Sequence, residues 1–181
     1  TKAQEYYWQL AQDFPMTYYG QLAQTRLVRR PVDSANEGLV TPQDHNISLS
    51  VLVKLEQDPH YQKAKELAKM GFMKETTEEL LYVSRTYRST EEVLFEIAVQ
   101  FEKVRAYDQA LIIAKRHFRD SIERKKVLRS SALWTIAYPN GYLPAIKRYV
   151  DSHVDPYLIA GIIREESLYN AEALSPVGAI G

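Results

Sequence analysis

The chain has 181 residues, of which 45% are hydrophobic, and this apolar content is sufficient to close the core of one ordinary domain. Its 23 Lys and Arg residues balance its 23 Asp and Glu residues without a long run of like charge, so the sequence is not typical of proteins that bind nucleic acid or a membrane surface. The lack of cysteine excludes disulfides and thiol chemistry, and these residues predict neither a membrane-spanning helix nor a secretory signal.

The sequence predicts an all-α fold. It has only 7 glycines, and the segments between its prolines are rich in Ala, Leu, Glu, Lys and Gln, as in consecutive helices joined by short turns. No segment alternates between apolar and polar residues over the length of a strand. In chain order, we expect helices over residues 3–13, 17–28, 43–55, 59–70, 75–86, 91–103, 107–116, 130–136, 142–151 and 156–169.

Prolines mark several of these boundaries. Pro is tolerated in the first turn of a helix, and a preceding Asp or Thr can cap the helix with its side chain. Three pairs therefore predict helix starts, namely Thr41-Pro42, Asp58-Pro59 and Asp155-Pro156. Two further prolines, Pro15 and Pro31, mark boundaries without a capping residue directly before them.

A weak internal repeat joins the middle helices. When residues 64–80 are shifted by 34 positions, four residues match others of similar character, and this is the period of helix-turn-helix arrays. The matching positions are Ala64, Leu67, Lys69 and Leu80, which fall on Ala98, Phe101, Lys103 and Ala114. Two unrelated amphipathic helix pairs of similar length would match nearly as well. Both interpretations predict stacked helix pairs, which usually serve in binding or scaffolding.

The histidines and tyrosines of this sequence are more typical of surface and packing positions than of a functional site. The four histidines, at positions 45, 60, 117 and 153, lack the spacing of metal ligands, so we expect no metal and no other cofactor. The 13 tyrosines are compatible with sugar binding, but tyrosines at helical spacing more often pack helices together.

A helix that starts at Pro156 carries an acidic residue within its apolar face. Advancing about 100° per residue places Glu166 near the centre of this face, whereas Glu165 falls on its flank toward solvent. The apolar residues of the face are Leu158, Ile159, Ile162, Ile163 and Tyr169. Burial favours the protonated carboxyl that a general acid needs to protonate a glycosidic oxygen. Geometry alone leaves open an alternative, in which Glu166 is buried and satisfied by a hydrogen bond or an ion pair.

The residues after this helix form a compact motif. Asn170 is expected to end the helix, and SPVGAIG at 175–181 supplies a Ser-Pro turn and two glycines that could lie close to a ligand. The stretch VDPYLIAGIIREESLYNAEALSPVGAIG, residues 154–181, resembles the opening of the catalytic domain of the soluble lytic murein transglycosylases. The matching motifs are Glu166-Ser167, Tyr169-Asn170 and Ser175-Pro176-Val177-Gly178-Ala179.

The resemblance extends over most of the chain. Residues 137–150 look like the segment that leads into that catalytic domain, and residues 6–27 look like the helical superhelix that precedes it. The resemblance implies a TPR-like α-superhelical region of stacked helix pairs over residues 1–140, followed by the N-terminal part of a lysozyme-like transglycosylase domain over residues 141–181. In the family pattern the domain continues beyond Gly181, so we expect this chain to be a truncated piece that is inactive alone.

The family resemblance implies a site and a mechanism. Glu166 matches the catalytic acid of the family, and Ser167, Tyr169, Ser175 and Gly178 would bind or orient the substrate. Glu166 would protonate the leaving oxygen between N-acetylmuramic acid and N-acetylglucosamine, then accept a proton from the 6-hydroxyl that closes a 1,6-anhydro ring. Hydrolysis by the usual pair of carboxylates needs a second acid, and the motif offers only Glu172.

The same resemblance implies that the partner is the glycan strand of peptidoglycan in the periplasm or cell envelope, without nucleic acid, cofactor or metal. Two alternatives stay open. The first is a helical-repeat binding module without activity. The second is a goose-type lysozyme-like hydrolase, which shares the Glu-Ser surroundings, although the superhelix-like N-terminal portion argues against it.

Overall fold

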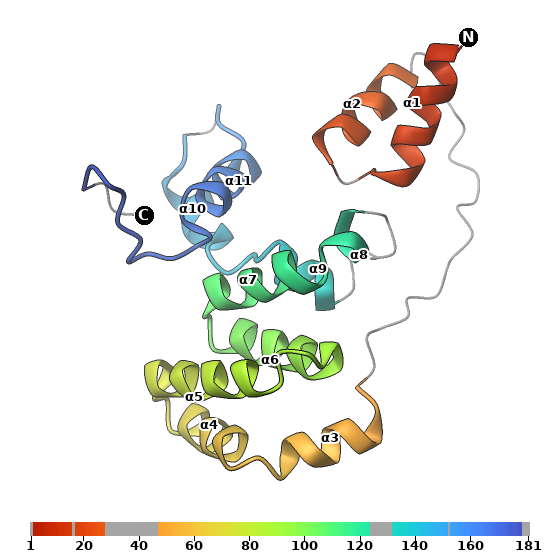
Figure 1. The fold of residues 1–181 in the computed structure, drawn as a ribbon. Coiled ribbons are helices and arrows are strands. Elements are labelled where there is room, and N and C mark those ends of the chain that lie inside the picture. The colour runs from red at the N-terminus through yellow and green to blue at the C-terminus, as the bar shows by residue number, and fades with distance from the viewer. Residues whose placement is uncertain (1, 16, 28–46, 124–131, 152, 179–181) are drawn as a thin grey trace.

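A computed structural model describes residues 2–15, 17–27, 47–123, 132–151 and 153–178, and over these ranges its helices confirm the all-α prediction (Figure 1). Among the described helices, none combines the length and the hydropathy that a membrane span requires. The helices are α1 (Lys2–Asp13), α2 (Tyr18–Leu27), α3 (Leu49–Glu56), α4 (Pro59–Lys69), α5 (Met73–Thr86), α6 (Glu91–Lys103), α7 (Tyr107–His117), α8 (Arg119–Glu123), α9 (Ala132–Ala137), α10 (Leu143–Tyr149) and α11 (Pro156–Ser167).

Most predicted helix boundaries agree with the structure to within a few residues, and three differ. Helix α3 begins at Leu49, later than predicted, and residues 43–46 of the expected helix lie outside the described residues. Helix α8 was not predicted, because five residues are too short to show a helical period. The expectation that Asn170 ends α11 is wrong, since α11 ends at Ser167 and is followed by Leu168 and Tyr169 in the left-handed region.

Two of the three predicted capping residues have the expected geometry. The carboxylate of Asp58 accepts hydrogen bonds from the backbone N–H groups of His60 and Tyr61, at 2.9 and 3.1 Å. The carboxylate of Asp155 accepts one from the N–H of Tyr157, at 2.9 Å. These bonds satisfy N–H groups that the first turn of a helix leaves unpaired. The third pair, Thr41-Pro42, lies outside the described residues.

The middle of the chain is a stack of helices in which α4 packs on α5, α5 on α6, α6 on α7, and α7 on α9 (Figure 1). Helix α6 lies within this stack, and the aromatic ring of Phe101 at its C-terminal end is fully buried. Small residues face it, among them Ala110 and Ala114 of α7, and they let the two helices approach closely. The largest core cluster therefore runs through α3 to α9.

Helices α1 and α2 form a hairpin that packs on itself. A Cβ atom on Gly20 would lie only 1.8 Å from the backbone oxygen of Phe14, so no larger residue fits at this crossing. The hydroxyl of Thr17 donates to the same Phe14 oxygen, at 2.8 Å, and accepts from the N–H of Gly20, at 3.1 Å. Gly20 thus supplies the small residue that the tight turn between these helices requires.

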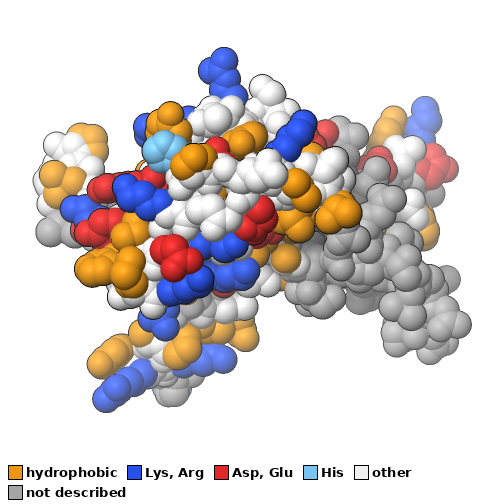
Figure 2. Space-filling model, turned by 90° about the horizontal axis from the view of Figure 1, so that it is seen from below, with side chains coloured by type: hydrophobic (Ala, Val, Ile, Leu, Met, Phe, Trp, Pro, Cys, Tyr) orange, Lys and Arg blue, Asp and Glu red, His pale blue; other side chains and the backbone are white. Residues whose placement is uncertain are grey.

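The face of the stack that is seen from below in Figure 1 mixes both signs of charge, as Figure 2 shows. Ion pairs join α4 to its neighbours in the stack. Lys63 Nζ lies 2.5 Å from Glu79 Oε1, and Lys65 Nζ lies 2.7 Å from Glu56 Oε2. His60 Nδ1 lies 2.6 Å from the other oxygen of Glu79. Opposite charges are thus interleaved here, and this face offers no extended patch of one sign.

Replacing Phe101 with alanine is expected to lower the free energy of unfolding by about 3–5 kcal/mol, because the ring is fully buried and the cavity can collapse only in part. Urea denaturation followed by circular dichroism measures this change. Phe72→Ala is the matched control, since its side chain is 51% exposed, and its expected cost is below about 1 kcal/mol. Equal destabilisation by the two variants would contradict the position of α6 in the core.

Glu79 is expected to make the stability of the protein depend on pH. Hydrogen bonds from Lys63 and His60 hold the pKa of the Glu79 carboxyl below its ordinary value. The unfolded chain therefore takes up this proton at a higher pH than the folded chain, so the stabilisation is present above the ordinary Glu range and is lost as the pH falls through the folded pKa. Urea unfolding of wild type and Glu79→Gln, from about pH 7 to about pH 3, tests this.

The gap in stability between wild type and Glu79→Gln should shrink as the solution becomes more acidic. Glu78→Gln is the control, because the Glu78 side chain is exposed and has no ion-pair partner among the described residues. A gap for Glu79→Gln that stays constant across the pH range would show that its carboxylate is not held by these bonds.

Candidate functional site

Helix α11 and the turn after it hold all the predicted site residues. The helix begins at the Asp155 cap and Pro156, and it packs against α10. Its last turn is closed by Leu168, whose N–H donates to the Arg164 oxygen at 3.1 Å while its backbone takes a left-handed conformation, with φ 53°. This conformation turns the chain sharply and directs Tyr169 back toward the body of the protein.

Tyr169 is the centre of an aromatic cluster, which we define as Tyr107, Tyr142 and Tyr169. The ring of Tyr169 is stacked on that of Tyr142, with centroids 5.8 Å apart, and meets Tyr107 of α7 edge-on at 6.3 Å. Its hydroxyl donates to the Ala160 oxygen at 3.0 Å, and burial raises the pKa of the Tyr169 phenol. Only 6% of the residue is exposed, so in this structure Tyr169 orients the end of α11 rather than facing solvent.

The aromatic cluster can form because residue 141 is a glycine. A Cβ atom on Gly141 would lie 1.9 Å from the hydroxyl oxygen of Tyr107. The segment before α10 therefore passes so close to Tyr107 that a side chain at position 141 would force the ring to move. The cluster joins three segments that are far apart in the sequence, so no local pattern could have predicted it.

Arg164 and Glu165 fix α11 to the helix stack. Arg164 Nε donates to the backbone oxygen of Ala137, at 3.0 Å, and its guanidinium lies 4.9 Å from the centroid of the Tyr138 ring. Glu165 pairs with this guanidinium and also lies 3.5 Å from Lys115 Nζ on α7. The Glu165 carboxylate is therefore engaged in ion pairs, although 62% of its side chain is exposed as its position on the flank predicts.

Glu166 lies on the outer side of α11, so the inward orientation that the sequence predicts is wrong. The helix is rotated so that Ile163 packs against the aromatic cluster, which leaves Leu158 and Ile162 58% and 49% exposed. Glu166 follows them at the same helical spacing, and together the three form what we call the exposed stripe of α11. The Glu166 side chain has no hydrogen bond or ion pair with any residue that the structure describes.

The other predicted site residues lie at the end of α11 and in the turn after it. The hydroxyl of Ser167 donates to the Ile163 oxygen one turn earlier, at 3.2 Å. Ser175 and Gly178 lie in a turn that is closed by a 2.9 Å hydrogen bond from the Gly178 N–H to the Ser175 oxygen. Gly178 has φ +83°, a conformation that favours glycine, and Val177 beside it is almost fully exposed. The predicted turn is therefore present.

The arrangement offers acid-base chemistry through exposed carboxylates. Glu172 is also exposed, and its N–H is held by the side chain of Asn170 at 2.9 Å. Among the described residues, no group of three or more His, Asp or Glu side chains is placed to hold a metal ion. An exposed carboxyl such as that of Glu166 or Glu172 can transfer a proton to or from a bound substrate.

Comparison of the chain with protein-family models, with curated proteins and with solved structures finds no match. The family resemblance therefore depends on the motif in residues 154–181. The transglycosylase activity, the substrate and the site roles stay predictions, and the geometry of α11 is the physical basis for proposing them.

Removing the aromatic ring of Tyr169 is expected to loosen α11 without unfolding the helix stack. In Tyr169→Ala the stack on Tyr142 and the hydrogen bond to Ala160 are lost, so the backbone amides of α11 should exchange with solvent at least about tenfold faster. Hydrogen exchange read by mass spectrometry measures this, with α6 as the internal reference. Tyr149→Ala is the control, because that side chain is exposed and outside the cluster. Unchanged exchange in α11 would show that the cluster does not hold it.

Proposed function

We propose that this chain belongs to a lytic transglycosylase, in which Glu166 acts on the β-1,4 bond between N-acetylmuramic acid and N-acetylglucosamine. One observation carries the proposal. Two adjacent glutamates at the end of α11 have different surroundings, since Glu165 is engaged by Arg164 and Lys115, whereas Glu166 is exposed and has no such partner among the described residues. A carboxylate that is not used to hold the fold is free to meet a substrate, and it stands at the Glu-Ser motif on which the resemblance depends.

The proposed reaction uses this carboxyl group twice. The protonated Glu166 donates its proton to the glycosidic oxygen, and the bond between C1 of the muramoyl sugar and that oxygen breaks. The N-acetyl group of the same sugar stabilises the charge that develops at C1. The 6-hydroxyl oxygen of that sugar then bonds to C1, and its proton passes to the Glu166 carboxylate. The products are a 1,6-anhydro end and a free 4-hydroxyl, with no water consumed.

The exposed stripe of α11 supports the same proposal. Leu158 and Ile162 are exposed and lie eight and four residues before Glu166, so they form an apolar surface on the same side of α11 as its carboxylate. A saccharide cleft needs a second wall, and we propose that this wall covers the stripe in the active enzyme. Closing the site in this way would exclude water from the bond that is cleaved.

We extend the proposal to the architecture and the location. Helices α5 and α7 begin at Met73 and Tyr107, 34 residues apart, and Ala64 and Ala98 are buried at corresponding places in the two preceding helices. This supports a TPR-like superhelical region over residues 1–140, followed by the start of a lysozyme-like domain over residues 141–181. The substrate class puts the protein in the periplasm or cell envelope.

Glu166→Gln in the protein at its natural length is expected to keep the fold and lower activity on peptidoglycan by about 10²-fold or more, because both proton transfers depend on that group. Glu165→Gln should have a mild effect, since its ion pairs are largely exposed and Arg164 keeps its hydrogen bond to the Ala137 oxygen. The assay digests purified sacculi with each variant, and mass spectrometry separates the anhydro product from the hydrolytic one by the mass of one water.

Two results would overturn this proposal. Equal activity of the two variants would show that Glu166 has no special role. Release of reducing-end muramic acid by the wild type would instead identify a lysozyme-like hydrolase. Circular dichroism of each variant separates loss of chemistry from loss of fold.

A further inference from the structure

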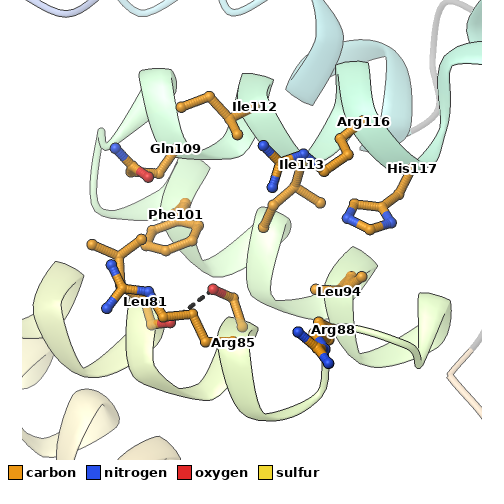
Figure 3. A pocket seen from close by; sticks show the side chains of 11 residues that line it. Leu81, Arg85, Arg88, Leu94, Phe101, Gln109, Ile112, Ile113, Arg116 and His117 are labelled. Carbon is orange, nitrogen blue, oxygen red and sulfur yellow. Dashed lines mark hydrogen bonds between the residues drawn. The ribbon is translucent and has the colours of Figure 1, made fainter.

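A groove of about 490 Å³ lies between α5 and α7 (Figure 3), and none of its described lining residues belongs to α11. Phe101 and Leu94 of α6 contribute to its apolar floor, together with Ile113 of α7. Its volume falls within the range of ligand-binding clefts, which combine an apolar lining with a few polar groups. The groove belongs to the helix stack, so it depends on α6 rather than on the C-terminal segment.

Three arginines stand at this groove, and their charges are not compensated. Arg85 is on the last turn of α5, Arg88 follows that helix, and Arg116 is on the last turn of α7. All three are exposed, and none forms an ion pair with a residue that the structure describes. None of the described residues that line the groove is acidic. Elsewhere on the stack, basic side chains such as Lys63 are paired with glutamates.

We propose that this groove binds an acidic peptide segment of a partner protein, with its carboxylates on Arg85, Arg88 and Arg116 and its apolar side chains against the floor. A guanidinium binds a carboxylate through two parallel hydrogen bonds, and clusters of arginines are a recurring means of recognising acidic motifs. The aliphatic floor accepts leucine-like side chains in the same segment. The ligand therefore alternates negative and apolar groups.

The lining favours a peptide over a nucleic acid. Proteins that bind single-stranded nucleic acid place exposed Phe, Tyr or Trp rings against the bases, and the one such side chain among the described residues of this groove is the fully buried Phe101. The chain as a whole has a net charge of zero, so it lacks the extended positive field that phosphate backbones require. The proposal is independent of the activity proposed for Glu166.

The test measures fluorescence anisotropy of a short labelled peptide in which Asp or Glu alternates with Leu, at about 0.15 M salt. The 181-residue chain is expected to bind this peptide, and a peptide with Gln and Asn in place of the acids is expected to bind much more weakly. The double variant Arg85→Gln, Arg116→Gln should weaken binding of the acidic peptide by about tenfold or more, because two charge-assisted contacts are lost.

The double variant Lys74→Gln, Lys103→Gln is the matched control, since it removes the same charge from exposed positions outside the groove. It should leave the affinity within about twofold of wild type. An equal loss of peptide affinity in both double variants would show that only the net charge of the protein matters, and this would overturn the proposal. The proposal would also be overturned if the neutral peptide bound as tightly as the acidic one, or if the acidic peptide did not bind. Tighter binding of a labelled oligonucleotide of similar length, which displaced the peptide, would overturn it as well.

Discussion

Burial of α6 is the constraint on which the described structure depends. One face of this helix is occupied by Val93, Ile97 and Phe101, which lose almost all contact with water, and α3, α5, α7 and α9 all pack against it. Most of the free energy that orders these helices must come from this shared apolar surface, because helices of this length are marginal alone. The positions of α5 and α7, and hence the groove between them, follow from how each meets α6.

The C-terminal segment is attached to this stack by contacts of another kind. Tyr107 projects from α7 into the cluster with Tyr142 and Tyr169, and Arg164 donates to the end of α9. These contacts are aromatic and polar, and no residue of α11 itself is buried. The candidate catalytic helix is therefore held at its end and along one side, while its opposite side stays open. The helices that stabilise the fold and the helix that carries the proposed catalytic carboxyl are thus different parts of the chain.

Local signals predicted most of the described helices, because helix periods and capping residues act within a few positions. Asp58 and Asp155 cap their helices as their sequence context predicts, and the bounds of α6 agree with the expectation. The orientation of α11 was predicted wrongly for Glu166, since its apolar face is wider than the surface that packs against it. Which part of that face is covered depends on Tyr107, a residue about sixty positions away along the chain, and a local pattern carries no such information.

Two consecutive residues with positive φ end α11, and neither is a glycine. Leu168 and Tyr169 have φ 53° and 63°, a conformation that costs about 1–2 kcal/mol for each L-amino acid. The offsetting energy comes from burial of the Tyr169 ring, so the point at which the helix stops is chosen by tertiary contacts rather than by local preference. Each residue added to the helix would advance the chain by about 1.5 Å and rotate it by about 100°. The register between Glu166 and the turn at Ser175 to Gly178 is therefore set by the buried ring of Tyr169.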